Sequence, residues 1–242
     1  MVHASIMDGP DPYASLGIRR RINAAGALTR LGGAIMAPEV VLAMAAASRA
    51  SVDIGELQDA ASKRIAEATG AEAGLVTTGA AAALTLAAAA VIAGWDVAKM
   101  SALPHAESFP RDILIPRTHR TGYAHALAAA GARLVDIGHN DRGTGAGVRG
   151  LEAWEIETAL APSVVAVAAA ANGATMADLP VMAAVCKAHG LPLIVDAAWP
   201  ELRMVVEADS QRFHGDWERA EVDRERDQLL ALHLLRQIAF QD

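Results

Sequence analysis

The feature of this sequence that most constrains its fold is a regular alternation of short β-rich runs with longer Ala- and Leu-rich stretches. The β-rich runs cover residues 73–77, 112–116, 133–137, 164–168 and 191–196. The stretches that are typical of helices cover residues 38–49, 54–69, 80–93, 123–131, 150–160 and 179–189. Apolar strands connected by helices form parallel sheets that are covered on both faces. We therefore predict an α/β fold with a parallel-rich sheet flanked by helices.

Composition excludes several classes of protein. The chain has 242 residues, a formal net charge of -7 and a single cysteine, Cys186. One cysteine excludes a disulfide scaffold and a cysteine-based zinc site, and the histidines show no metal-ligand spacing, so we expect no metal. The acidic balance argues against a nucleic-acid partner. The apolar run over residues 79–95 is shorter than the roughly 20 residues of a membrane span, and the N-terminus does not resemble a signal peptide. A cytoplasmic protein with no membrane partner is expected.

The sequence divides into three parts. Residues 1–37 form an N-terminal segment, residues 38–203 carry the strand–helix alternation, and residues 204–242 form a divergent charged tail. From residue 207 onward the tail is charged and then Leu-rich, which predicts one or two amphipathic helices over residues 216–238. A Gly-rich polar stretch over residues 140–150 predicts a loop.

Ligands of parallel sheets bind outside the carboxyl ends of the strands, so functional residues are sought there. The run at 73–77 leads into Thr77, Thr78 and Gly79, and a helix is predicted to start at Ala80. Free N–H groups at a helix start bind anions, and the two hydroxyls add donors. The segment is therefore a candidate phosphate site. An ordinary helix cap is the alternative interpretation, because Thr and Gly are common at caps.

Two further candidates follow later strands. Asp196 comes at the end of the run at 191–196, where a carboxylate can bind a metal, act as a base or hold a protonated ring nitrogen; a loop-capping role is the alternative. His119 follows the run at 112–116 and is flanked by Arg117 and Arg120. These side chains can stack on a ring or hold an anion, although a histidine in a loop is more often solvated.

Four segments together resemble the fold type I pyridoxal-phosphate enzymes, in the family of selenocysteine synthase and D-glucosaminate-6-phosphate ammonia-lyase. The resemblance extends over residues 13–203 and is carried by residues 21–40, 52–90, 118–138 and 191–198. It implies an aspartate-aminotransferase-like large domain and the cofactor pyridoxal 5'-phosphate (PLP). It further implies that the residues 77–80, namely Thr77, Thr78, Gly79 and Ala80, hold the cofactor phosphate. His119 is then expected to lie against the pyridine ring and Asp196 to pair with its nitrogen.

Within this family, the acidic charge and an opening motif that begins at Arg21 favour the branch with small-molecule substrates. The implied reaction is α-proton abstraction from an amino acid or amino sugar acid, followed by β-elimination and loss of ammonia. The family also implies a homodimer or higher homo-oligomer. A selenocysteine synthase-like transferase and a non-catalytic phosphate-ligand-binding or interaction protein are the alternative functions.

The resemblance ends at about Arg203. Family members continue into a further strand and a Ser-Gly-Gly-Lys-type loop whose lysine forms the Schiff base. The chain has three lysines, all before Asp196: Lys63 and Lys187 are predicted on helices and Lys99 in a loop. We therefore expect a truncated chain with no assigned catalytic lysine and impaired activity.

Overall fold

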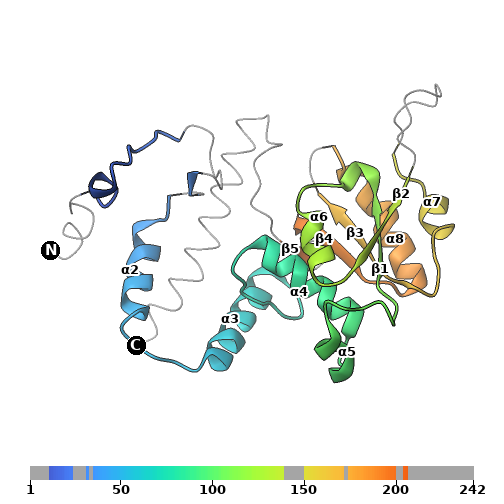
Figure 1. The fold of residues 1–242 in the computed structure, drawn as a ribbon, viewed down its shortest axis with the longest axis horizontal. Helices are drawn as coiled ribbons and strands as arrows, with labels where there is room; N and C mark the ends of the chain where they lie inside the picture. Colours follow the sequence, from blue (N-terminus) through green and yellow to red (C-terminus); the bar gives the residue numbers. More distant parts are fainter. Residues whose placement is uncertain are drawn as a thin grey trace.

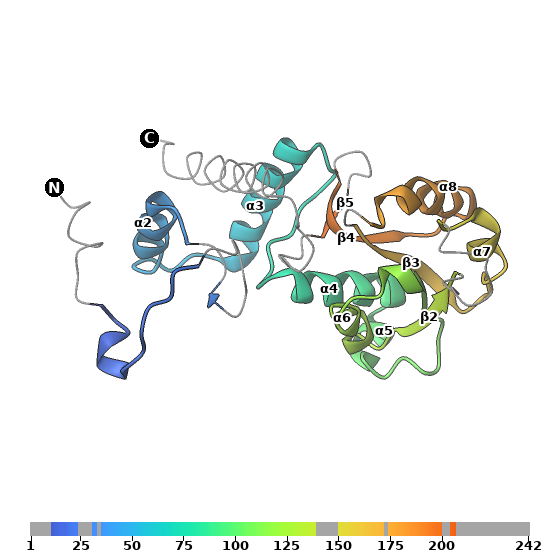
Figure 2. The same ribbon diagram turned by 90° about the horizontal axis from the view of Figure 1, so that it is seen from above.

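The structure, a computed structural model, describes residues 11–23, 31–32, 35–138, 150–171, 174–199 and 204–206. Its centre is a sheet whose strands lie in the order β2 (Arg133–Ile137), β1 (Asp112–Pro116), β3 (Val164–Ala170), β4 (Leu193–Trp199) and β5 (Met204–Val206). Figures 1 and 2 show helices against both faces of this sheet, with α2 (Pro38–Ala47) and α3 (Ile54–Thr69) lying to one side beyond α4 (Ala80–Ala93). None of the described helices has the length and apolar character needed to cross a membrane.

Four of the described strands run parallel. The strands are β1 (Asp112–Pro116), β2 (Arg133–Ile137), β3 (Val164–Ala170), β4 (Leu193–Trp199) and the short β5 (Met204–Val206). Strand β1 pairs in parallel with β2 and β3, β3 pairs in parallel with β4, and β5 is antiparallel to β4. The predicted parallel-rich α/β fold is confirmed. Because β5 joins the sheet, the sheet extends three residues past the boundary expected at residue 203.

Four of the described α-helices precede β1, and three connect the strands β1 to β4. They are α2 (Pro38–Ala47), α3 (Ile54–Thr69), α4 (Ala80–Ala93), α5 (Val97–Ala102), α6 (Ala124–Ala129), α7 (Ala153–Glu157) and α8 (Leu179–His189), with short 3-10 turns η1 (Ala14–Leu16), η3 (Arg117–His119) and η4 (Met176–Asp178). The bounds of α3, α4 and α8 match the prediction, whereas α2, α6 and α7 are shorter than predicted.

Helix α5 was not predicted, and it contains Lys99, so the placement of this lysine in a loop was wrong. The helix forms because the side chain of Asp96 accepts hydrogen bonds from the backbone N–H groups of Ala98 and Lys99, at 2.9 and 3.2 Å. An aspartate that satisfies these otherwise unpaired donors is a favourable helix cap.

Side-chain alternation along the strands divides the core into two layers. Ile113 and Ile115 of β1 face one layer, and Leu114 between them faces the other. The first layer packs on α4 and α6 through Leu84, Ala88, Ile92, Ala124 and Leu127. The second layer packs on α7 and α8 through Ile156, Leu179, Met182, Val185 and Cys186. Small residues permit close packing in the first layer, where Ala88 and Ala166 are fully buried.

The strand predicted at residues 73–77 is absent, and this prediction was wrong. The segment is irregular and lies along α3. The side chain of Gln58 donates to the carbonyl of Val76 at 2.8 Å and accepts from its N–H at 3.2 Å, and Ser62 accepts from the N–H of Gly74 at 3.0 Å. Side chains of α3 thus supply hydrogen bonds that a neighbouring strand would otherwise provide.

The two remaining predicted strands have different bounds in the structure, since β3 ends two residues later than predicted and β4 is shifted toward the C-terminus. The loop predicted at residues 140–150 falls, except for Gly150, outside the described residues. The helices predicted at residues 216–238 lie wholly outside them.

Candidate active site

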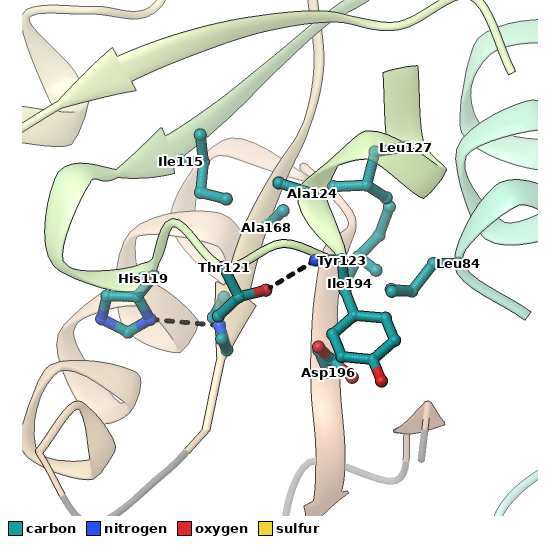
Figure 3. A pocket seen from close by; sticks show the side chains of 12 residues that line it. Leu84, Ile115, His119, Thr121, Tyr123, Ala124, Leu127, Ala168, Ile194 and Asp196 are labelled. Atoms are coloured by element: carbon teal, nitrogen blue, oxygen red, sulfur yellow. Dashed lines mark hydrogen bonds between the residues drawn. The ribbon is translucent and has the colours of Figure 1, made fainter. Parts of the chain in front are cut away.

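An open pocket lies where β1, β3 and β4 meet α4 and the segment from η3 to α6, with about 260 Å³ of empty space that includes its opening to solvent. Figure 3 shows the side chains that line it. Its apolar floor is made by Ile115, Ala168 and Ile194, one residue from each of the three strands. Leu84 in the second turn of α4 and Leu127 of α6 form apolar walls. The polar side chains among the described lining residues are His119, Thr121, Tyr123 and Asp196.

Asp196 reaches the pocket because of the strand period of two. Ile194 faces the first core layer, so Asp196, two residues later on β4, faces the same side. Its Oδ1 atom is buried, while the residue as a whole is partly exposed. The parallel ladder between β3 and β4 ends at the pair Ala170–Asp196. Asp196 therefore marks the end of the parallel pairing rather than the end of the strand, which continues to Trp199.

His119 is buried, with 1% of its surface exposed, so the alternative of a solvated loop histidine is wrong. It ends the turn η3, which directly follows β1. Its Nδ1 accepts a hydrogen bond from the N–H of Ala170 at 3.2 Å, and its Nε2 lies 3.1 Å from Oδ2 of Asp178. His119 and Asp196 thus line one pocket.

Arg117 and Arg120 flank His119 but do not line the pocket. Both are exposed, and Nε of Arg120 lies 2.6 Å from Oδ1 of Asp136, on the neighbouring strand β2. This ion pair directs Arg120 toward β2. The two arginines are therefore not part of the described pocket.

The predicted phosphate segment lies at the start of α4 and does not line the pocket itself. Gly79 is the residue before the helix, with a φ of 118° and no side-chain cap on the first turn. The hydroxyl of Thr77 donates to the carbonyl of Gly79 at 3.0 Å. Thr78 is exposed and Ala80 partly buried. The pocket begins at Leu84, five residues after Gly79, or about 7.5 Å along a helix axis.

This arrangement places both predicted groups at one end of the sheet. The start of α4 carries uncapped N–H groups, its second turn contributes Leu84 to the pocket, and Asp196 contributes the carboxylate on the same side. A flat heterocycle with an anionic substituent matches such an arrangement, because helix starts attract anions and apolar walls exclude water.

Sequence reasoning missed two residues of this region. Tyr123 lines the pocket, and its ring is drawn next to Asp196 in Figure 3. It is one of only two tyrosines in the chain and immediately precedes α6. Its place between a strand and the following helix could have marked it as a candidate from the sequence. Asp178, the partner of His119, ends the turn η4 and gave no signal, because the pairing joins residues 59 positions apart.

Three groups with shifted pKa values lie away from the pocket. At the start of β1, hydrogen bonds from Arg133 and Ser163 lower the pKa of Asp112 below its usual range, against the opposing effect of burial. Hydrogen bonding to Asp112 raises the pKa of Arg133 in turn. In the second core layer, burial raises the pKa of the Cys186 thiol to about 11. The hydrogen bonds of Asp112 connect strands of the sheet, and Cys186 is a core residue. None of these groups lines the pocket.

Comparison with known proteins gives two curated relatives and a solved structure. The chain is 30% identical over 200 residues to D-glucosaminate-6-phosphate ammonia lyase of Salmonella typhimurium, covering 79% of this chain and 52% of that protein. It is 32% identical over 193 residues to 5'-C-glycyluridine monooxygenase-decarboxylase of a Streptomyces species, covering 77% and 47%. No protein-family model matches the chain.

A solved structure of D-glucosaminate-6-phosphate ammonia-lyase superposes on this chain with a TM-score of 0.71 and 30% identity, covering 80% of this chain and 53% of that one. The chain spans about half the length of the curated relatives it matches. Sequence and fold thus agree on the same relative. The chain belongs to the fold type I pyridoxal-phosphate enzyme family that its sequence predicted, as a homologue of D-glucosaminate-6-phosphate ammonia lyase.

Proposed function

We propose that this chain binds pyridoxal 5'-phosphate and belongs to an ammonia lyase that acts on an amino sugar acid. The observation that supports this most directly is the pocket in which His119, Asp196 and the second turn of α4 meet. The similarity to D-glucosaminate-6-phosphate ammonia lyase supports the reaction type and the class of substrate. The whole activity is a proposal, because the chain corresponds to about half of that relative.

The residues present fit the cofactor. The first turn of α4 has no side-chain cap, and a Cβ added at Gly79 meets no atom within 4 Å, so a phosphate has both open space and N–H donors there. Thr77, Thr78 and Ala80 border the same helix start and complete the proposed phosphate site. The apolar floor and the Asp196 carboxylate suit an aromatic ring with a basic nitrogen.

Each of these groups has a distinct task in the proposed site. PLP, when bound, supplies an electron sink for negative charge that develops on the substrate. Asp196 accepts a hydrogen bond from the protonated ring nitrogen, and its negative charge favours that protonated form. His119 provides a wall against which the flat ring packs. Leu84 and Leu127 exclude water, which strengthens the interaction between Asp196 and the ring nitrogen.

We further propose that this chain holds PLP without a covalent bond. Lys63 lies on α3, Lys99 on α5 and Lys187 on α8, and no lysine lines the described pocket. Borohydride reduction of the PLP-loaded chain, followed by mass spectrometry, is expected to leave all three lysines unmodified. A reduced adduct on any of them contradicts noncovalent binding.

The test of cofactor binding is equilibrium dialysis of PLP against the 242-residue chain. Asp196→Ala is expected to weaken binding strongly. Asp136→Ala is the matched control, because Asp136 is also near the carboxyl end of a parallel strand but lies outside the pocket. Absence of saturable PLP binding by the unmodified chain refutes the proposed function.

The reaction requires a separate test, because the two curated relatives carry names of different reactions. Ammonia release from D-glucosaminate 6-phosphate, measured with PLP present, tests the lyase proposal. PLP binding without ammonia release on this chain supports the alternative of a ligand-binding protein.

We also propose that the chain forms a homodimer or higher homo-oligomer in the cytoplasm. Helix α2 has no buried residue, and Ile35, Met44 and Ile54 are more than half exposed. An apolar surface of this kind is favourable only when covered. Cys186 is a free thiol, as expected in a reducing compartment. Sedimentation equilibrium tests the oligomeric state, and a monomer at all concentrations refutes it.

A further inference from the structure

Asp178 is a buried carboxylate for which the proposed site gives no task. Only 8% of its surface is exposed, and it is the last residue of the turn η4, directly before helix α8. Buried carboxylates are costly unless their oxygens accept hydrogen bonds. Both oxygens of Asp178 do so, and one of the two donors is a residue of the pocket.

The two donors come from separate parts of the fold. The N–H of Leu151, before α7, donates to Oδ1 of Asp178 at 2.9 Å. The Nε2 of His119 lies 3.1 Å from Oδ2. On the other side of the ring, the N–H of Ala170 at the end of β3 donates to Nδ1 at 3.2 Å, which Figure 3 shows as a dashed line.

These contacts define the tautomer of His119. A backbone N–H can only donate, so Nδ1 must act as an acceptor and carries no proton. The proton is therefore on Nε2, where it is donated to Asp178. With both nitrogens engaged in the plane of the ring, rotation of the imidazole breaks two hydrogen bonds, and only the ring faces remain for other contacts.

Gly150 adds a steric requirement to this pair. A Cβ added at Gly150 lies 3.1 Å from Oδ1 of Asp178, closer than an ordinary van der Waals contact. The absence of a side chain at residue 150 therefore lets the Asp178 carboxylate occupy the place from which it receives both hydrogen bonds.

We propose that Asp178 is a positioning residue, which fixes the Nε2–H tautomer and the ring orientation of His119 so that a face of the imidazole is presented to the pocket. The consequence for PLP rests on the proposed function, whereas the tautomer and orientation do not. Carboxylates orient histidines in this way at many functional sites.

The first test reads the tautomer directly, in the 242-residue chain without cofactor. ¹⁵N-labelled histidine and a His119→Ala spectrum identify the ring signals of His119. The unmodified chain is expected to show the Nε2–H tautomer. Asp178→Asn keeps the side-chain volume but offers one oxygen acceptor instead of two, so it cannot accept from both Leu151 and His119. Its spectrum is expected to lose the single-tautomer signature.

Thr175→Val is the matched control. The Thr175 hydroxyl is buried and donates to the carbonyl of Ala170, at the same strand end. This variant is expected to reduce the stability of the fold while leaving the His119 signals unchanged. Gly150→Ala is a second probe that keeps every hydrogen-bonding group and is expected to shift the His119 signals by displacing Asp178.

The second test connects the pair to the pocket. Asp178→Asn is expected to weaken PLP binding about tenfold, as is common for coupling between contacting groups, and to have no further effect in a His119→Ala background. In the first test, the proposal is overturned by a different tautomer in the unmodified chain, or by His119 signals that are unchanged in both Asp178→Asn and Gly150→Ala. In the second test, it is overturned if Asp178→Asn lowers the PLP affinity equally with and without His119. If the chain binds no PLP, the proposed function fails, and the tautomer measurement still decides the role of Asp178.

Discussion

At the scale of single residues, the pocket combines a carboxylate and an imidazole that differ in their surroundings. His119 is enclosed, and both of its ring nitrogens lie within hydrogen-bonding distance of partners. Asp196 is partly exposed and faces the pocket from the last pair of the parallel ladder. This division suits a site in which the histidine provides shape and the aspartate provides charge.

The charge of Asp196 can be tested separately from the phosphate site. Asp196→Asn is expected to weaken the binding of pyridoxal 5'-phosphate about ten- to a hundredfold, which corresponds to the loss of one hydrogen bond to a charged group. Inorganic phosphate, which lacks the ring, is expected to bind to the proposed phosphate site with the same affinity in both proteins, where it competes with PLP. Competition assays measure both effects. An equal loss of phosphate affinity means that Asp196 does not act on the ring.

At the scale of elements, the start of α4 joins the irregular segment 73–77 to the wall of the pocket. Gly79 has a φ of 118° and a ψ of 170°, a region that residues with a side chain rarely adopt. The conformation turns the chain into the helix without a capping side chain. The exposed N–H groups of the first turn depend on this conformation.

Gly79→Ala is therefore expected to reduce the free energy of unfolding by about 1 to 3 kcal/mol and to weaken phosphate binding. The cause is backbone strain, because no atom lies within 4 Å of the added Cβ. Gly122→Ala is the control, since Gly122 is exposed, has no neighbour within 4 Å and has an ordinary φ. Urea denaturation measures the difference, and equal stability of the two variants contradicts the strain argument.

A second contact between elements predicts a dependence of stability on pH. Asp112 of β1 accepts hydrogen bonds from Arg133 of β2 and from Ser163 before β3, so it ties three strands together. These bonds hold the pKa of Asp112 below its usual range in the folded state. The ionised carboxylate therefore stabilises the fold above its unfolded pKa of about 3.9, and this contribution is lost as the pH falls through the lower, folded pKa.

Asp112→Asn is expected to reduce the free energy of unfolding at neutral pH by about 1.5 to 3 kcal/mol. The difference from the unmodified chain should shrink as the pH falls below about 4. Asp136→Asn is the control, because its ion pair with Arg120 is half-exposed and worth less. Urea denaturation over a pH series provides the measurement. A difference that stays constant into the acid range is inconsistent with this role for Asp112.

At the scale of the whole molecule, the second core layer encloses the single cysteine. Cys186 of α8 is buried in the second layer, and burial raises its pKa to about 11. The thiolate is the reactive form, so the thiol is inert while the fold is closed. Because the neutral thiol is favoured in the folded state, this contribution to stability is complete below the unfolded pKa of about 8.5. It is lost as the pH rises toward 11.

A thiol reagent such as Ellman's reagent is expected to label Cys186 slowly in the folded chain and rapidly in urea. Labelling in the folded chain should require the opening of the fold. Met182→Ala enlarges the same layer and is expected to speed the reaction, because it destabilises the core. Fast labelling of the unmodified chain contradicts a closed second layer.

The sequence was most informative where a local signal was strong. Helix α4 and strands β1 and β2 have the predicted bounds, and α4 in particular is apolar at every position but Thr85. The apolar run at residues 73–77 looked equally like a strand, but Gln58 and Ser62 of α3 satisfy its backbone groups instead. A short apolar run does not by itself determine its secondary structure. The structure it adopts depends on which neighbouring element supplies hydrogen bonds to its backbone.

The sequence by itself determined the alternating architecture, the family and the candidates Asp196 and His119, because periodicity and motifs are properties of neighbouring residues. Only the tertiary structure decided that these two side chains share a pocket with Leu84 and Tyr123, and that Asp178 pairs with His119. Contacts between residues many positions apart depend on strand order and on which face of the sheet each helix covers. Those relations form when the layers pack, and no local pattern of residues encodes them.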